Sequence, residues 1–434
     1  MDLVHYFTNQ LERGETMRLQ HSSISNLLLL PKQYHLEKGH EHMVSEILIS
    51  NKIFKQLYEL EGAIQPTMAS LEARGLVVSG KWFENGMRGK ANQLEEVVAE
   101  INHYIGGSNE YVDQQLLNEF WVKEGLPKAS TTYELNNYKN LHPIYYLMLK
   151  HNRYVSYVNQ WGYNLRKKGI KLPDGNIRIK GKWLSFSSHT GRITAKQLPL
   201  TSLPKVMREY IVAPEGTQLF SIDLSNAELR FLALYANCEP LMKKFSEGID
   251  VHSETAMLIQ KQIGKLALDE KVTRELAKTF TYSYLYGAGP KKMLENFRKI
   301  NRSVTYKEVM RITAAFNQSY PELENFLSER EDSELLLTPF GLIKPVAEFT
   351  SGSKRNFSMQ SSVSVAIKLL MLMLTEYKIE VHHVLHDEVW VKIPEEIDDD
   401  DLVEKITERF GQEMTKYFEG FPLNGLLQGK IIGG

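Results

Sequence analysis

The segment from Val381 to Ile393 constrains the fold of this chain more than any other stretch. Its flanks are β-branched and apolar with nearly alternating polarity, which is typical of two antiparallel strands joined by a tight turn. The predicted tip is charged, with Asp387 and Glu388 side by side and no glycine. Two adjacent carboxylates at such a tip are either an acidic turn in solvent or part of a site for a divalent cation. Taken alone, the segment favours the solvated turn.

A second acidic element lies far upstream, at residues 219–230. An apolar run predicts a strand that stops at Asp223 and turns into a helix. A carboxylate at a strand end, facing another carboxylate on a neighbouring hairpin, can hold two divalent ions for in-line phosphoryl transfer. Oxygen ligands favour Mg²⁺ or Mn²⁺ over Zn²⁺, and Cys238 is the only cysteine. Together the two elements favour a two-metal site.

The bulk properties of the chain are those of a globular protein with more than one lobe. Its 434 residues can bury a large core, and 42% of them are hydrophobic against 24% charged. The apolar run at residues 27–30 is too short to span a bilayer, and no signal peptide precedes it. The sequence therefore predicts a cytoplasmic protein without disulfides.

Charge is unevenly distributed, although the net charge is only −1. Asp174 is the only acid between residues 150 and 208, and aromatic residues are interleaved with the bases there. Such a stretch fits a phosphate backbone better than an ordinary solvated face, which mixes both signs. The acidic run at residues 395–401 is interpreted as a solvated loop. The basic residues of the stretch are Lys150, Arg153, Arg166, Lys167, Lys168, Lys171, Arg178, Lys180, Lys182, Arg192, Lys196, Lys205 and Arg208.

A third element is a helical pattern with functional side chains at four-residue steps. Arg274, Lys278, Tyr282 and Tyr286 fall on one broad stripe of a helix, with the cations near one end and the aromatics near the other. Cations suit the phosphates of a nucleoside triphosphate, and an aromatic face suits its base and sugar. The same spacing is also typical of a stripe that faces a hydrophobic core. The stripe alone leaves both interpretations open.

In this order, the three elements resemble motifs A, B and C of the A-family DNA polymerases. Motif A is Asp223–Arg230, motif B is Arg274–Gly287, and motif C is His386–Glu388. Further matches lie at residues 189–192, 200–204, 250–256 and 356–360. So many ordered motifs at the family's spacing make coincidence improbable.

The alternation of sheet-forming and helical segments itself predicts an α+β architecture, with a helical block inserted over a sheet. The resemblance implies a right-hand polymerase fold, with an antiparallel sheet in the palm and helical fingers and thumb. It places the palm at residues 51–82, 170–233 and 345–434, the thumb at 83–169 and the fingers at 234–344. Residues 1–50 form an N-terminal segment to which no role is assigned.

The resemblance also implies roles for individual residues. Asp223, Asp387 and the backbone carbonyl of Leu224 would bind two Mg²⁺ ions, with Mn²⁺ able to substitute and Glu388 nearby. Lys278 would both bind the triphosphate and protonate the departing pyrophosphate. The other implied nucleotide-binding residues are His252, Arg274, Tyr282, Tyr286 near the templating base and Glu228 against a ribose 2′-hydroxyl. The implied DNA-binding residues are Arg192, Thr201, Ser202, Arg208, Asn356, Gln360 and His386.

The implied activity is template-directed addition of deoxynucleotides to the 3′-hydroxyl of a primer. The enzyme would act as a monomer on primer-template DNA, with accessory replication proteins as further partners. No 3′→5′ exonuclease activity is expected, because about fifty residues before the palm cannot hold a proofreading domain. Two alternatives are a single-subunit RNA polymerase, which Glu228 and Glu388 argue against, and an inactive primer-template binding protein, which the intact acidic and basic residues argue against.

Several positions depart from the family's pattern. Leu224 stands where Tyr is usual, and we expect this to be tolerated because the backbone is the ligand there. Tyr282 stands where many bacterial members have Phe, and this predicts ready incorporation of dideoxynucleotides. The Thr201-Ser202 pair shortens the side chains expected to reach the minor groove. The remaining departures are Asn226 in place of Gln, Thr281 in place of Asn and Ser361 in place of Gly.

Overall fold

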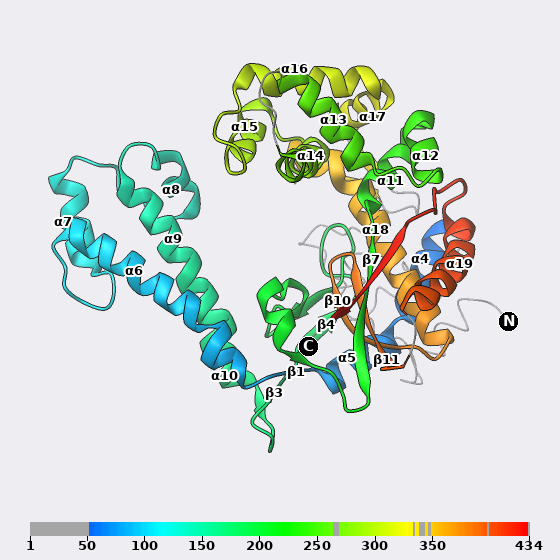
Figure 1. Cartoon of the computed structure of the whole chain (residues 1–434), viewed down its shortest axis with the longest axis horizontal. Coiled ribbons are helices and arrows are strands. Elements are labelled where there is room, and N and C mark those ends of the chain that lie inside the picture. The colour runs from blue at the N-terminus through cyan, green and yellow to red at the C-terminus, as the bar shows by residue number, and fades with distance from the viewer. Residues whose placement is uncertain are drawn as a thin grey trace. The chain divides into compact units, whose positions relative to one another are not determined.

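The computed structural model describes residues 52–263, 269–332, 335–337, 343–345, 349–396 and 399–432. The N-terminal segment of residues 1–50 lies outside these described residues. The described chain divides into two compact units, each built from segments distant in sequence (Figure 1). The first unit holds the described residues up to Leu71, residues 183–195 and residues 216–431. The second unit holds residues 72–182 and 196–215.

A four-stranded sheet positions the two acidic segments within the first unit. Its strand order is β10-β11-β7-β12, and β11 pairs antiparallel with both β10 and β7. In the register of β7 and β11, Asp223 lies directly opposite Glu388. The predicted strand and the predicted hairpin are therefore direct neighbours in one sheet. The strands are β7 (Thr217–Leu224), β10 (Glu380–Leu385), β11 (Glu388–Pro394) and β12 (Leu427–Ile432).

The hairpin turn is tighter than the sequence analysis anticipated. Leu385 pairs with Glu388, so only His386 and Asp387 connect the two strands. His386 has a φ of 47°, a left-handed conformation that lets the chain reverse without a glycine. Glu388 is consequently the first residue of β11 and not part of the tip, and it is buried.

One long apolar helix, α18 (Ser351–Glu376), forms the core of the first unit. It contacts β10, β11, α4 (Lys52–Ala63), α11 (Ala227–Tyr235) and α19 (Asp399–Tyr417). Among the described residues, α18 is the only helix long and apolar enough to cross a membrane. Its most apolar part is 89% buried inside the protein, which is typical of the core helix of a globular fold.

Helices dominate residues 227–332, as predicted. The central pair is α13 (Val251–Ile263) and α14 (Glu270–Leu285), and α13 also contacts α16 (Tyr306–Ser319). Asp269 caps α14 by accepting from the backbone nitrogens of Lys271 and Val272. The helix ends at Leu285, and Gly287 two residues later has the positive φ of 66° that commonly follows a helix C-terminus. The other elements of this block are α12 (Glu239–Ser246), α15 (Pro290–Arg298), α17 (Pro321–Asp332), β8 (Leu335–Leu337) and β9 (Ile343–Pro345).

The acidic run at residues 395–401 is not only a loop, and that interpretation was wrong in part. Glu395 and Glu396 form a turn, residues 397 and 398 lie outside the described residues, and α19 begins at Asp399. Carboxylates in the first turn of a helix are stabilised by its N-terminal partial positive charge.

The second unit contains a helical layer with its own core and a small sheet. Its sheet order is β2-β3-β1-β6, with β3 and β6 antiparallel to β1. The core between the helices includes Ile101, Trp121, Leu135 and Tyr145. The helices are α6 (Arg88–Ile105), α7 (Gln114–Lys123), α8 (Thr132–Tyr138), α9 (Pro143–Tyr157) and α10 (Leu165–Lys168), and the strands are β1 (Leu76–Val78), β2 (Ile170–Lys171), β3 (Ile177–Ile179) and β6 (Ile211–Val212).

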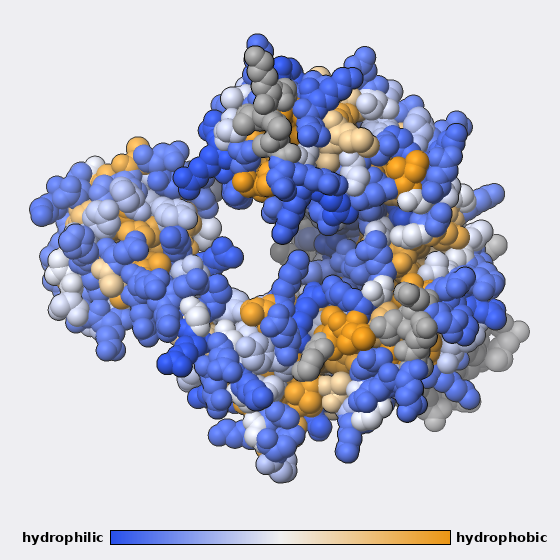
Figure 2. All heavy atoms as spheres, in the orientation of Figure 1, coloured by the Kyte–Doolittle hydropathy of each residue, from blue (hydrophilic) through white to orange (hydrophobic). Residues whose placement is uncertain are grey.

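The basic stretch lies mainly in the second unit and is largely exposed. Hydrophilic residues predominate on the face of the protein in Figure 2, and apolar residues form small separate patches there. The bases therefore remain available to a polyanion rather than packing in the core. Those that are exposed are Arg153, Arg166, Lys167, Lys168, Lys171, Arg178, Lys180, Lys182, Lys196 and Lys205.

Candidate active site

Two adjoining cavities of the first unit collect most of the predicted site residues. The Arg274 cavity has a volume of about 320 Å³ and the Glu228 cavity about 330 Å³. Four residues line both of them, so they are compartments of one cleft large enough for a small-molecule ligand. The shared residues are Asn226, His252, Tyr282 and Asp387.

Asp223 and Asp387 converge on the Arg274 cavity from neighbouring parts of one sheet. Asp223 is near the end of β7, and the backbone nitrogen of Leu224 donates to the backbone oxygen of Asp387 at 3.1 Å. Both carboxylates and Leu224 line this cavity. The sheet therefore brings together two acids that are distant in sequence, as the resemblance implied.

The donor set at this point fits a magnesium site completed by substrate. Burial raises the pKa of the Asp387 carboxyl, which shows a carboxylate whose charge the surrounding protein does not fully offset. A bound cation would offset it. Among the described residues no three His, Cys, Asp or Glu side chains form a ready-made metal cluster. Mg²⁺ is commonly held by one or two carboxylates plus substrate phosphates and water, so two acids and a carbonyl suffice.

Glu388 does not line any of the cavities described here. Its Oε1 accepts hydrogen bonds from the hydroxyl of Ser221 and, at 2.8 Å, from the indole nitrogen of Trp390. All three side chains lie on the same face of the sheet, because Trp390 pairs with Ser221 and Glu388 with Asp223. The carboxylate of Glu388 is thus engaged within the sheet, beside the strand end that carries Asp223.

The predicted stripe of α14 faces the cleft and not the core. Arg274, Lys278 and Tyr282 line the Arg274 cavity, and Tyr282 and Tyr286 line the Glu228 cavity. Tyr282 is 45% exposed and Tyr286 40%, whereas Phe280 on the other side of the helix is fully buried. Burial, and then the negative charges of Asp387, Glu228 and Asp223, raise the pKa of Tyr282 to about 12, so three carboxylates act on this phenol.

Arg274 is held at the entrance of the Arg274 cavity by an ion pair. Its Nε and Nη2 lie 3.2 and 2.9 Å from Oδ2 of Asp250, and Oδ1 of Asp250 accepts from the backbone nitrogen of His252 at 3.0 Å. Burial pushes the pKa of Asp250 upward, but hydrogen bonds from Arg274 and Ser253 outweigh it and bring the pKa to about 2. Asp250 therefore stays ionised and orients the guanidinium.

His252 lies between the two cavities as a neutral, buried imidazole. Burial lowers its pKa to about 4, so the ring carries no charge at neutral pH. Its Nδ1 is buried and has no hydrogen-bond partner among the described residues. A buried ring nitrogen without a partner is costly unless a ligand supplies one.

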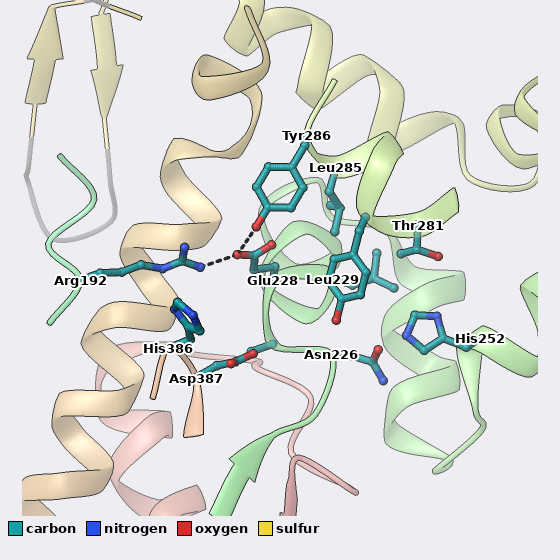
Figure 3. A pocket seen from close by; sticks show the side chains of 12 residues that line it. Arg192, Asn226, Glu228, Leu229, His252, Thr281, Leu285, Tyr286, His386 and Asp387 are labelled. Carbon is teal, nitrogen blue, oxygen red and sulfur yellow. Dashed lines mark hydrogen bonds and ion pairs between the residues drawn. The ribbon is translucent and has the colours of Figure 1, made fainter. Parts of the chain in front are cut away.

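Glu228 is fixed by two hydrogen bonds to the same oxygen (Figure 3). Its Oε1 accepts from Nη2 of Arg192 at 2.8 Å and from the hydroxyl of Tyr286 at 3.0 Å. Burial raises the pKa of this carboxyl, and the charge of Arg192 opposes the rise. Oε2 is buried and has no partner among the described residues. His386 and Asp387 line the same cavity.

A third cavity, the Gln360 cavity, has a volume of about 480 Å³ and shares Tyr286 with the Glu228 cavity. Asn356 and Gln360 of α18 line it, and Asn356 is buried. His189 and Thr190, which belong to a sequence match upstream of motif A, line it as well. The predicted DNA-binding residues of α18 thus line a cavity that adjoins the Glu228 cavity.

Thr201, Ser202 and Arg208 belong to the second unit and line none of these cavities. Thr201 and Ser202 lie in the 3₁₀ helix Leu200–Ser202, and Arg208 lies in the 3₁₀ helix Lys205–Tyr210. Thr201 is buried and Ser202 is exposed. Of this pair, only Ser202 presents its side chain to solvent.

Several residues that line the Arg274 cavity were given no role by the sequence, among them Asp250, Asn226 and Gln428. Asp250 is the first residue of the matched segment 250–256. An acid just before the helix that carries His252 could have indicated a role at the site. Asn226 has a φ of 54°, which Asn adopts more readily than most residues. Gln428 comes from β12, and no local pattern marks it.

Comparisons with known proteins bear on the family and the fold of this chain. The family model of DNA polymerase family A matches residues 83–423. DNA polymerase I of Helicobacter pylori is 26% identical over 345 residues, which cover 73% of this chain and 37% of that protein. The thermostable DNA polymerase I of Thermus aquaticus is 24% identical over 409 residues, which cover 83% of this chain and 47% of that protein. The chain thus spans less than half the length of these relatives.

A solved structure shares the fold. The POL domain of Pol1 from M. smegmatis, in complex with DNA primer-template and dNTP, superposes with a TM-score of 0.65 at 17% sequence identity. The match covers 85% of this chain and 69% of that one. The α+β polymerase fold that the resemblance implied is therefore confirmed.

Proposed function

The chain belongs to DNA polymerase family A, and from that premise we propose that it is a DNA-directed DNA polymerase that adds deoxynucleotides to a primer 3′-hydroxyl. One observation carries the proposal: Asp223 and Asp387 line the same cavity as Arg274 and Lys278. Acids for metal ions and cations for a triphosphate are the two requirements of nucleotidyl transfer. The primer-template and dNTP of the M. smegmatis complex support DNA and deoxynucleotides as the partners here.

The proposed chemistry is an in-line attack by the primer hydroxyl on the α-phosphate. Two Mg²⁺ ions bound by Asp223, Asp387 and the carbonyl of Leu224 would lower the pKa of that hydroxyl and offset the charge of pyrophosphate. Arg274 and Lys278 bind the phosphates, and Lys278 donates a proton to the departing pyrophosphate. Neutral His252 contributes a hydrogen bond to a phosphate oxygen instead of a charge, because burial keeps its pKa near 4.

The Glu228 cavity selects the sugar. Arg192 and Tyr286 hold the carboxylate in one position, where it excludes a ribose 2′-hydroxyl. The same arrangement disfavours the alternative of an RNA polymerase, since a ribonucleotide would have to displace a carboxylate held by two hydrogen bonds. Glu388 supports the site indirectly, because Ser221 and Trp390 occupy its Oε1 beside Asp223.

The primer-template contacts are proposed for side chains of both units. Arg192, Asn356, Gln360 and His386 would contact the primer terminus and the minor groove, where acceptors are similar on every base pair. Ser202 and Arg208 would contact the duplex from the second unit, whereas the side chain of Thr201 is buried. The division into palm, fingers and thumb, a monomeric state and a cytoplasmic location complete the proposal.

The decisive test is single-nucleotide primer extension by the pure protein with and without Mg²⁺. Wild type should extend a primed template only with the metal and should prefer deoxynucleotides to ribonucleotides. Asp387→Asn keeps the shape of the side chain but removes its charge, and we expect incorporation to fall by at least ~10³-fold, because electrostatic preorganisation of this kind supplies several kcal/mol. Binding of the primer-template should change little.

Asp401→Asn, an equivalent change at an exposed position of α19, serves as the matched control and should behave as wild type. Metal-independent extension, or full activity of Asp387→Asn, would contradict the proposed mechanism. The same gel reports whether the protein degrades a mismatched primer.

A further inference from the structure

A fully buried ion pair in the first unit takes no part in the mechanism above. Glu61 of α4 and Lys368 of α18 are both 0% exposed, and the ammonium of Lys368 donates to Oε1 of Glu61. Lys368 is among the largest fully buried side chains of the protein. Desolvating two charges is expensive, and an apolar pair of similar volume commonly gives equal or greater stability. Stability therefore does not explain this pair well.

The ammonium of Lys368 has a second partner that points to the active site. It donates to the backbone oxygen of Gly191 at 2.7 Å, and the hydroxyl of Ser364, one helical turn earlier on α18, donates to the same oxygen at 2.5 Å. Two side chains of the core helix thus fix one peptide carbonyl. That carbonyl belongs to the peptide bond between Gly191 and Arg192, so its orientation sets where the Arg192 side chain begins.

The local backbone leaves this peptide little freedom in other directions. Gly191 has a φ of 74°, and a Cβ there would lie 2.5 Å from the ring of Phe186. The backbone nitrogen of Arg192 donates to the hydroxyl of Ser188 at 2.8 Å. The ammonium of Lys368 lies 4.9 Å from the centre of the same Phe186 ring. The turn is therefore held by the ion pair on one side and by its own hydrogen bonds on the other.

We propose that Lys368, held by its hydrogen bond to Glu61, is a positioning residue that fixes the Gly191–Arg192 peptide so that Arg192 reaches Glu228. The contacts run without a gap from Glu61 to Lys368, to the Gly191 carbonyl, to Arg192 and to Glu228. The inference rests on the proposed function, because it assigns to the ion pair the geometry of the sugar-selecting carboxylate.

The test removes both charges together. The double variant Glu61→Leu/Lys368→Met leaves no buried charge without a partner, so folding should be preserved. Either single substitution would leave one buried charge without its partner. Glu413→Gln/Lys416→Met, which removes an exposed ion pair of α19, is the matched control. The first measurement is hydrogen exchange, which needs no activity. Residues 186–194 should exchange faster in the buried-pair variant, and residues 380–394 should exchange as in wild type.

The second measurement is single-nucleotide incorporation in two backgrounds. The buried-pair variant should lower kcat/KM by ~10-fold, since a misplacement of about 1 Å can cost up to 10²-fold. In an Arg192→Ala background the same change should cost less than about 2-fold, because the group it positions is gone. The exposed-pair control should leave kcat/KM unchanged in both backgrounds, so that only Arg192→Ala itself lowers it in the second.

The proposal is overturned if hydrogen exchange at residues 186–194 is unchanged. It is also overturned if kcat/KM falls equally in both backgrounds, because an equal loss indicates a general loss of structure. If wild type incorporates no nucleotide at all, the proposed function fails on its own. The exchange measurement then still decides whether the ion pair fixes the turn.

Discussion

At the scale of single residues, burial changes the proton affinity of His252. Its pKa near 4 lies below the ordinary value of 6.5 because burial disfavours the charged ring. Between these two pH values the unfolded chain binds a proton that the folded chain does not, so stability is fully present above pH 6.5 and is lost as the pH falls toward 4. The shift corresponds to roughly 3 kcal/mol at most.

We therefore expect His252→Gln to flatten the pH dependence of unfolding in this range. Urea melts at pH 7, 5.5 and 4.5 would measure the free energy of unfolding at each pH. His103→Gln, at an exposed position of α6, is the control. If the variant loses as much stability as wild type between pH 7 and 4.5, the imidazole is not the group that titrates.

Tyr282 carries the second prediction at this scale. It lines both cavities. In the proposed function its hydroxyl would take the place of the 3′-hydroxyl that a dideoxynucleotide lacks as a hydrogen-bond partner. Tyr282→Phe should therefore raise discrimination against dideoxynucleotides by ~10-fold or more, the value of one hydrogen bond to a charged group. Competition between dideoxy- and deoxynucleotides in primer extension measures this ratio, and equal ratios for both proteins would contradict the assignment.

Local sequence was sufficient to find residues that share a helix but not residues that meet through the fold. Arg274, Lys278 and Tyr282 follow from a four-residue period, and the structure places all three on one cavity. The pairing of Arg274 with Asp250 depends on how α13 packs against α14, which no spacing reveals. Glu388 was placed one position too close to the tip because the left-handed φ of His386 shortens the turn.

At the scale of elements, the residues just after α14 approach α18 closely at two glycines. A Cβ on Gly352 would lie 2.4 Å from the backbone oxygen of Tyr286, and one on Gly287 would lie 3.2 Å from Cα of Gly352. The close approach is therefore possible only without side chains at these positions. Tyr286 directly follows α14. The close approach to α18 therefore helps to determine where the Tyr286 hydroxyl lies relative to Oε1 of Glu228.

Gly352→Ala should push the end of α14 away from α18 and weaken the bond between Tyr286 and Glu228. We expect a loss of stability of about 1–3 kcal/mol from overpacking and a drop of ~10-fold in the preference for deoxynucleotides over ribonucleotides. Gly89→Ala, where a Cβ meets nothing within 4 Å, is the control. An unaltered sugar preference would show that the close approach does not position Tyr286.

Element types were easier to predict than element ends. Alternation identified the hairpin, and the four-residue spacing from Arg274 to Tyr286 identified α14. The start of α19 at Asp399 was missed, because a run of acids resembles a loop unless its stabilisation at a helix N-terminus is considered.

At the scale of the whole molecule, the net charge of −1 conceals a strongly basic stretch between residues 150 and 208. If this stretch binds the phosphate backbone, the Kd for primer-template should rise by ~10²-fold or more between 50 and 200 mM salt. Lys167→Gln/Lys171→Gln, at two exposed positions, should reduce the slope of log Kd against log salt by about 1 to 2.

The control for this prediction is Lys405→Gln/Lys416→Gln on α19, outside the stretch, which should leave the slope unchanged. Fluorescence anisotropy with a labelled primer-template gives the slope directly. A Kd that does not depend on salt would mean that the bases of the stretch do not contact phosphate.

The division into two units could not be predicted from the sequence. The chain leaves the first unit after Leu71, returns at residues 183–195 and returns again at residue 216. Such passages depend on contacts between segments distant along the chain, and no composition change marks them. The resemblance supplied a three-part division, and that division stays a prediction.

The strand order β10-β11-β7-β12 has a consequence for biosynthesis. β7 carries Asp223, yet both of its neighbours in the sheet are translated much later, and β12 comes after α19. A nascent chain still attached to the ribosome before Leu427 has emerged would leave one edge of β7 unpaired. Asp223 and Asp387 meet earlier, when β11 pairs with β7, so until β12 has docked the nascent protein exposes a strand edge with which a second chain can pair.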